Sequence, residues 1–209
     1  MCTSCMKEIG KHTRDAVESE EIVLRAVEHT QKGTMTPTLI LESDSVRNHG
    51  KLFLGGFKAA INTEFLKKEN ITHVLNVAGK GLGIMFGPKY REISREMKKN
   101  LNITGLDLDW EDSMKYHITE DDFKQAICFI HEGMKSGSVL VHCAQGKSRS
   151  GAAVSSYLMA TRKMTTIESI EFIQQKRKMV DPNPNFRILL IKFEKSETLR
   201  ALREDFSMQ

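Results

Sequence analysis

The sequence has few cysteines and no long hydrophobic run. Its cysteines, Cys2, Cys5, Cys128 and Cys143, are too few for a disulfide framework in a chain of this size, which favours a reducing compartment. The first residues lack the apolar stretch of a secretory signal, and no run approaches the roughly 20 apolar residues that a membrane span needs. We therefore expect a soluble protein of the cytoplasm, with the nucleus as the alternative, and no membrane partner.

A strong excess of one charge is also missing. The chain carries 31 Lys and Arg against 27 Asp and Glu, a net charge of +4. This excess is too small to predict a nucleic-acid partner, although it is compatible with an anionic substrate bound locally. With 209 residues, 40% of them hydrophobic and 28% charged, the chain fits one globular domain with a modest appendage.

Strand-like and helix-like segments alternate after a polar beginning. Residues 1–49 are predicted to form a helical extension that packs on the core or serves a partner, and residues 50–209 the main domain. Apolar strands are expected at residues 52–57, 72–78, 105–110 and 138–143. Amphipathic helices are expected between and after them, with a glycine-rich loop at residues 79–87. This alternation predicts an α/β fold with a central, mostly parallel sheet flanked by helices.

The stretch VHCAQGKSRS, residues 141–150, joins the last of these strands to a helix. In open α/β sheets, ligands bind beyond the carboxyl ends of the strands, where Cys143 is placed. The backbone N–H groups of a loop that leads into a helix N-terminus form a cradle for an anion. The cradle residues are expected to be Ala144, Gln145, Gly146, Lys147, Ser148 and Arg149. Gly146 permits a tight turn, and the planar guanidinium of Arg149 matches two phosphate oxygens.

The same positive field favours the thiolate of Cys143. A thiolate beneath a bound phosphate predicts attack on phosphorus and a cysteinyl-phosphate intermediate that water hydrolyses. Ser150 is expected to donate a hydrogen bond to the departing thiolate. His142 is expected to orient the loop and not to act as the base.

Three other interpretations of this stretch explain less. A buried core cysteine would leave the six-residue spacing from Cys143 to Arg149 unexplained. A nucleotide-binding Walker loop requires glycine five positions before Gly146, where Val141 stands. A phosphate-binding module without chemistry would be expected to lack the nucleophile, which is intact.

His142-Cys143, Gly146 and Arg149-Ser150 together resemble the HC-x5-R-S signature of cysteine-based protein phosphatases, and the S-R-S ending resembles that of their dual-specificity branch. The resemblance extends in order over roughly residues 50–195 and is that of a small, atypical member. It implies metal-independent hydrolysis of phosphotyrosine and of phosphoserine or phosphothreonine in protein substrates, with no cofactor. Cys143 would be the nucleophile and Arg149 the phosphate clamp.

Cleavage of a phosphate ester also requires a proton donor to the leaving oxygen. The resemblance places this acid on an Asp about 30 residues before the nucleophile. LDWED offers Asp112, which we favour, Asp109 as the alternative, and Glu111. The resemblance also assigns Asn183 to a structural turn near the cradle. The basic stretch Gln175-Lys176-Arg177-Lys178 is expected to be a solvated helix end, with binding of acidic phosphosubstrates as the alternative.

Two other functions remain as alternatives. One is hydrolysis of a non-protein phosphate, namely a phosphoinositide, an RNA 5'-phosphate or a glucan phosphate. The other is a scaffold that holds phosphoproteins without turnover. The sequence predicts no particular oligomeric state.

Overall fold

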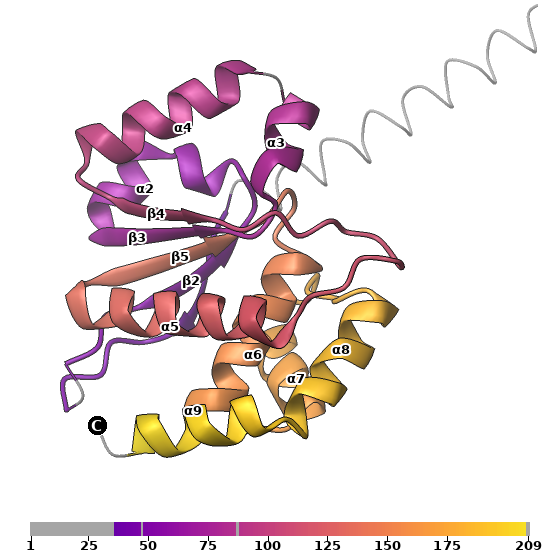
Figure 1. Cartoon of the computed structure of the whole chain (residues 1–209). Helices are drawn as coiled ribbons and strands as arrows, with labels where there is room; N and C mark the ends of the chain where they lie inside the picture. Colours follow the sequence, from indigo (N-terminus) through magenta and orange to yellow (C-terminus); the bar gives the residue numbers. More distant parts are fainter. Residues whose placement is uncertain (1–35, 47, 87, 208–209) are drawn as a thin grey trace, which may run out of the picture. The chain divides into compact units, whose positions relative to one another are not determined.

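The computed structural model describes residues 36–46, 48–86 and 88–207, and its centre is a five-stranded sheet (Figure 1). The strands lie in the order β1-β2-β5-β3-β4. Their bounds are Thr38–Leu41 (β1), Leu52–Gly55 (β2), Ile71–Asn76 (β3), Thr104–Asp107 (β4) and Ser138–His142 (β5). Strands β2, β5, β3 and β4 run parallel, whereas β1 runs antiparallel to β2. The predicted mostly parallel sheet is confirmed.

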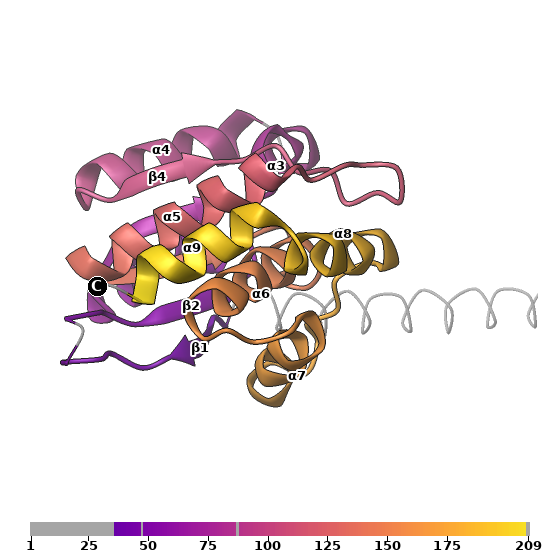
Figure 2. The same ribbon diagram turned by 60° about the horizontal axis from the view of Figure 1, so that its bottom comes forward.

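Helices cover both faces of this sheet (Figures 1 and 2). The short helix η1 (Ala59–Ile61), α2 (Thr63–Lys68) and α4 (Pro88–Asn100) lie on one face, and α3 (Gly79–Phe86) precedes α4. The other face carries α5 (Glu120–Ser136), α6 (Arg149–Thr161), α7 (Thr166–Lys176), α8 (Pro184–Glu194) and α9 (Glu197–Ser207). In the described part of the chain, no helix combines the length and the apolar character needed to cross a membrane.

Two apolar cores follow from the alternation of side chains along the strands. In β5, Val139 and Val141 belong to the larger core beneath α5 and α6, whereas Leu140 belongs to the smaller core beneath η1 and α2. Every residue of β5 is buried, as expected for a central parallel strand covered on both faces. This burial explains the continuous apolar run of SVLVH and fixes the position at which the strand delivers Cys143.

Strand β1 lies within the segment predicted as the extension. Its Thr38 pairs with Leu54 and its Leu39 with Phe53, so the sheet begins before residue 50. Residues 1–35 of the extension predicted to be helical lie outside the described residues. The division of the chain at residue 50 stays a prediction.

Candidate active site

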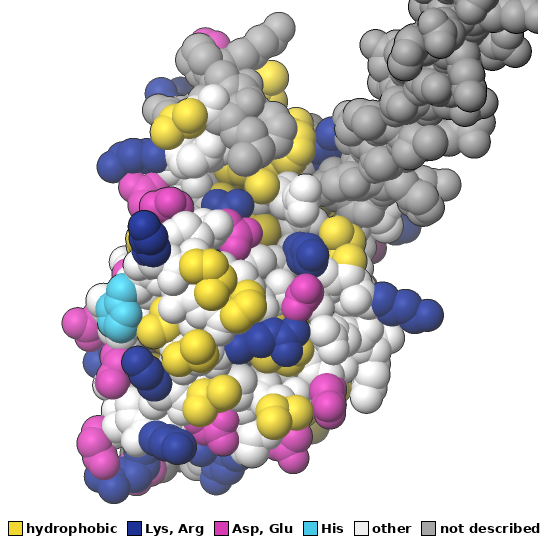
Figure 3. All heavy atoms as spheres, turned by 90° about the vertical axis from the view of Figure 1, so that its right-hand side faces the viewer, with side chains coloured by type: hydrophobic (Ala, Val, Ile, Leu, Met, Phe, Trp, Pro, Cys, Tyr) yellow, Lys and Arg dark blue, Asp and Glu magenta, His cyan; other side chains and the backbone are white. Residues whose placement is uncertain are grey.

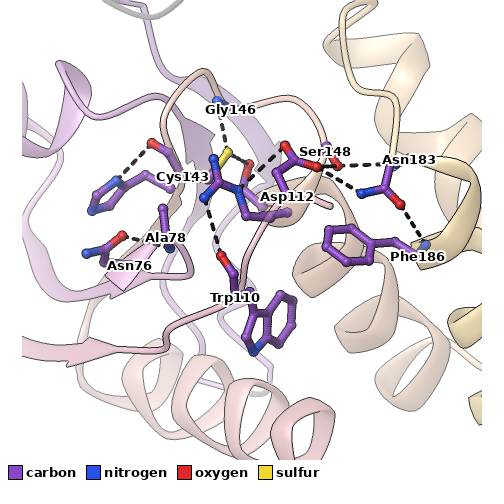
Figure 4. A network of polar contacts seen from close by, with 12 residues as sticks. Asn76, Ala78, Trp110, Asp112, Cys143, Gly146, Ser148, Asn183 and Phe186 are labelled. Atoms are coloured by element: carbon purple, nitrogen blue, oxygen red, sulfur yellow. Dashed lines mark hydrogen bonds and ion pairs between the residues drawn. The ribbon is translucent and has the colours of Figure 1, made fainter. Parts of the chain in front are cut away.

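Cys143 follows β5 directly, and the loop of residues 143–148 connects it to α6. The thiol is buried, with 2% of the residue exposed. Its Sγ accepts a hydrogen bond from the backbone N–H of Gly146 at 3.3 Å (Figure 4) and lies 3.2 Å from Oγ of Ser150. The predicted nucleophile and the predicted donor to it therefore lie in contact.

The turn of the loop depends on Gly146. Its φ of +71° is in the left-handed region that side chains disfavour. A Cβ at this position would also lie 2.5 Å from the carbonyl carbon and oxygen of Gly55, at the end of β2. Glycine is therefore required by conformation and by space, and its absence of a side chain lets the loop close against the sheet.

Arg149 begins α6 with its side chain turned back toward the loop. The residue is 9% exposed. Its Nη1 donates to the carbonyl oxygen of Trp110 at 3.3 Å, and its Nε lies 3.6 Å from Oδ2 of Asp112. Trp110 is itself buried and packs edge-on against Phe123. A buried tryptophan thus fixes the backbone carbonyl that orients the guanidinium.

Asp112 lies against the same loop (Figure 4). Its Oδ1 accepts hydrogen bonds from Oγ of Ser148 at 2.7 Å and from Nδ2 of Asn183 at 2.9 Å. Its side chain keeps 37% of its surface exposed, so it is accessible to a substrate at the mouth of the loop. The favoured carboxylate, the phosphate loop and the clamp are brought together.

Asn183 makes three hydrogen bonds, two through its side chain and one through its backbone N–H. Its Oδ1 accepts from the N–H of Phe186 at 2.9 Å and caps α8, while its Nδ2 holds Asp112. Its own N–H donates to Oγ of Ser148 at 3.2 Å. The predicted structural turn is therefore also a direct neighbour of the candidate acid.

Asp109 occupies a different environment. Its carboxylate accepts from the backbone N–H of Lys80 at 2.6 Å and pairs with Nζ of Lys80 at 3.1 Å. These contacts hold Asp109 at the beginning of α3. Glu111 is exposed. Of the three carboxylates, Asp112 contacts Ser148 and Arg149 of the loop and its helix, which favours it over Asp109.

His142 is buried at the end of β5, with 1% of its surface exposed. Burial lowers its pKa to about 4, and the hydrogen bond between Nδ1 and the carbonyl of Cys143 offsets only part of this effect. The ring is therefore neutral at pH 7. This state suits the predicted role of a group that orients the loop.

The structure corrects the expectation for Arg177. This residue ends α7 and is 6% exposed, so it does not belong to a solvated helix end. Its Nε donates to the carbonyl of Gly146 at 2.9 Å and its Nη2 to that of Gln145 at 3.3 Å. Sequence reasoning missed this contact because the surrounding residues are polar and give no sign of burial.

A second residue missed from the sequence is Asn185, in the first turn of α8. Its Nδ2 donates to the carbonyl of Tyr116 at 2.6 Å and so fastens the segment that follows Asp112. The other predicted cradle residues behave differently: the side chains of Gln145 and Lys147 are exposed, and Lys147 lies 3.7 Å from Asp181. Within the described ranges, no cluster of His, Cys, Asp or Glu is arranged to hold a metal ion.

Figure 3 shows the face at which the parallel strands end. Basic, acidic and hydrophobic side chains are intermixed on it, without a broad area of one charge. The positive field at the loop is therefore local. It comes from the buried guanidiniums of Arg149 and Arg177 and from the N-terminus of α6.

A cysteine loop that links a central parallel strand to a helix, closed by an arginine, defines the class of cysteine-based phosphatase folds. Residues 52–196 match the family described as dual specificity phosphatase, catalytic domain. The chain belongs to this family, and the expected resemblance is confirmed.

In two relatives, the region that matches this chain spans most of the relative's length. Dual specificity protein phosphatase 1B of Arabidopsis thaliana is 36% identical over 146 residues, which are 69% of this chain and 78% of that protein. Human dual specificity protein phosphatase 22 is 32% identical over 147 residues, 70% of this chain and 71% of that protein. MAP kinase phosphatase with leucine-rich repeats protein 3 of Dictyostelium discoideum is 34% identical over 91% of this chain, which spans only 20% of that relative's length.

Solved structures agree with the fold. The crystal structure of DUSP15 has a TM-score of 0.61 at 28% identity, covering 76% of this chain and 91% of that one. The human tyrosine phosphatase-like serine/threonine/tyrosine-interacting protein has a TM-score of 0.60 at 26% identity, covering 76% and 95%.

Proposed function

We propose that this chain hydrolyses phosphotyrosine and phosphoserine or phosphothreonine in proteins, without a metal ion, through a cysteinyl-phosphate intermediate. The observation that carries this proposal is the meeting of Cys143, Arg149 and Asp112 around one loop. A nucleophile, a phosphate clamp and a proton donor are the three groups that such a reaction needs. Family membership supports the same reaction class.

In the first step, the thiolate of Cys143 attacks phosphorus. The P–S bond forms, the bond from phosphorus to the side-chain oxygen of the substrate breaks, and Asp112 gives its proton to that oxygen. The loop N–H groups and Arg149 stabilise the charge on the equatorial oxygens. Arg149 is suited to this role because Trp110 already holds its guanidinium at the loop by a hydrogen bond of 3.3 Å.

In the second step, water attacks the cysteinyl phosphate. Asp112, now a carboxylate, takes a proton from that water, the P–S bond breaks, and inorganic phosphate leaves. Ser150 stabilises the departing thiolate, because its Oγ lies 3.2 Å from Sγ. The hydrogen bond of 3.3 Å from the N–H of Gly146 to Sγ acts in the same direction.

The alternatives differ from this proposal in substrate or in turnover. A solved neighbour, PTPMT1, has been determined in complex with PI(5)P, but at 22% identity it shares the fold alone. Nothing in the described site favours a lipid, an RNA end or a glucan over a phosphoprotein. A scaffold without turnover would not need the contact between Ser150 and Cys143.

The test is phosphate release, with metals chelated, from a peptide phosphorylated on both Thr and Tyr. The wild-type chain is expected to release phosphate from both residues, and Cys143→Ser from neither. Cys128→Ser is the matched control, because Cys128 is the half-buried thiol of α5 and lies outside the loop. Absence of release by the wild-type chain would contradict the proposal, and lipid, RNA and glucan phosphates would then be tested.

A further inference from the structure

The backbone carbonyls at positions 144–147 of the phosphate loop each accept a hydrogen bond from a donor outside the loop. The backbone N–H groups of Phe57 and Asp181 donate to the carbonyls at positions 144 and 147, at 3.1 and 3.2 Å. The two carbonyls between them, at positions 145 and 146, both accept from Arg177. Arg177 is therefore the side chain that closes the middle of the loop.

The directions of these two carbonyls set the directions of the N–H groups in the same peptide units, which are the groups proposed to bind the phosphate. A peptide unit is planar and trans, so its C=O and its N–H point in opposite directions. The carbonyl of Gln145 belongs to the same peptide unit as the N–H of Gly146, which donates to Sγ of Cys143 at 3.3 Å. When Arg177 holds this carbonyl outside the loop, it aims the N–H at the sulfur.

The other side of the same guanidinium reaches the edge of the sheet. Its Nη1 donates to the carbonyl of Thr36 and to Oγ1 of Thr38, both at 3.1 Å. Thr38 is the first residue of β1, and α7, which Arg177 ends, lies beside that strand (Figure 2). Both threonines precede residue 52, where the match to the family begins.

We propose that Arg177 is a positioning residue that ties the phosphate loop to β1, so that a strand before the matched family region sets the geometry of the phosphate site. The inference rests on the proposed function for its effect on turnover. A lysine in place of Arg177 keeps the charge but cannot supply a planar fork to the loop and the strand together. Arrangement of the fork, and not charge alone, is the essential property.

The experiment compares four variants of the full chain. Arg177→Lys keeps the charge, Thr38→Val removes the acceptor hydroxyl at nearly constant shape, and Thr38→Ser restores it. Arg203→Lys is the matched control, because Arg203 also bridges two carbonyls, those of Met159 and Met164, at 2.9 and 3.0 Å. It joins α9 to α6 and to the segment that follows α6, and both of these hydrogen bonds lie outside the loop.

Two readouts are measured for each variant, together with its melting temperature. The first is kcat/KM on the phosphopeptide and its dependence on pH. The second is the affinity for tungstate, a phosphate-like anion, determined by calorimetry without turnover. Because a displacement of about 1 Å can cost on the order of 100-fold in rate, Arg177→Lys is expected to lower kcat/KM about 10- to 100-fold. Loss of one hydrogen bond predicts a fall of about 3- to 10-fold for Thr38→Val and recovery for Thr38→Ser.

Tungstate binding is expected to weaken in the same order, while Arg203→Lys changes neither readout. Unchanged tungstate affinity in folded Arg177→Lys and Thr38→Val would overturn the proposal. So would equal losses in Arg203→Lys, which would indicate a general loss of stability. If the wild-type chain showed no turnover yet tungstate affinity followed the expected order, the proposed function would fail and the positioning role of Arg177 would stand.

Discussion

The replacement Asp112→Asn isolates the proton that the proposed mechanism requires. Asparagine has nearly the same shape as aspartate and keeps a side-chain oxygen that can accept hydrogen bonds. In the wild-type chain, Oδ1 of Asp112 accepts from Oγ of Ser148 at 2.7 Å and from Nδ2 of Asn183 at 2.9 Å. The loop and its clamp should therefore stay in place while the acid is lost. Removal of a general acid is expected to lower kcat by about 10²- to 10⁴-fold, or roughly 3 to 5 kcal/mol in activation free energy.

The loss should depend on the leaving group. The alkoxide of threonine is a poor leaving group and needs the proton, whereas the anion of an acidic phenol leaves without it. Initial rates are measured with a phosphothreonine peptide and with an aryl phosphate of an acidic phenol. The variant should lose most of its activity on the first substrate and much less on the second.

Asp109→Asn is the control for the alternative acid. An asparagine there retains an acceptor for the N–H of Lys80, and the lost ion pair joins groups that are 48% and 81% exposed, so it is worth about 0 to 1 kcal/mol. Activity should be unchanged. If Asp109→Asn were the damaging change, or if Asp112→Asn slowed both substrates equally, the assignment of the acid would be wrong.

Three further changes probe the loop and its supports. In the folded chain, burial lowers the pKa of His142 to about 4 from its ordinary value of 6.5. The neutral ring therefore contributes its full stability above pH 6.5, and this contribution is lost as the pH falls toward 4. His142→Asn should make the stability of the chain less sensitive to acid over this range. Urea unfolding at pH 7 and pH 4 should differ by about 3 kcal/mol less in the variant. Gly146→Ala should abolish tungstate binding measured by calorimetry, because its Cβ would meet Gly55. Asn183→Ala removes the cap of α8 and should lower the free energy of unfolding in urea by about 1 kcal/mol. It also removes the hydrogen bond to Asp112 and should therefore lower kcat.

The changes at His142 and Asn183 each have a control variant. His117→Asn replaces an exposed histidine and is the control for the loss of an imidazole. Asn183→Ser keeps a capping oxygen without the amide that reaches Asp112, so stability should recover while kcat stays low. Full recovery of kcat in Asn183→Ser would contradict the contact with the acid, and normal tungstate binding by Gly146→Ala would contradict the steric argument.

The central elements of the fold could be predicted because the pattern of apolar residues in each of them shows which residues are buried. β5 and α5 are examples. Strand β1 was not predicted: it is an edge strand of four residues, of which Thr38 and Leu39 are half-buried and only Ile40 and Leu41 are buried. The glycine-rich stretch at residues 79–86 was expected to be a loop but forms α3. Asp109 supplies an acceptor for the N–H of Lys80 near its start, and Gly79 leaves room for that carboxylate.

The candidate site shows the same division. Its nucleophile, loop and clamp occupy one continuous stretch, so their spacing alone predicted their proximity. The residues that hold this stretch come from elsewhere: Arg177 lies 31 positions beyond Gly146, and Asn185 binds a carbonyl 69 positions before it. A single sequence carries no signal for such contacts, because the acceptor in each case is a backbone carbonyl, which every residue type has.

The outward carbonyls explain why a short signature is not sufficient for a phosphate site. A loop whose N–H groups converge on an anion must direct its carbonyls outward, and buried carbonyls without donors are costly. Here the donors come from Phe57 after β2 and from Arg177 and Asp181 after α7. The shape of the loop is thus maintained by segments on two sides of the signature. A chain that kept Cys143 and Arg149 but lost these donors would retain the chemical groups without the geometry that makes them reactive.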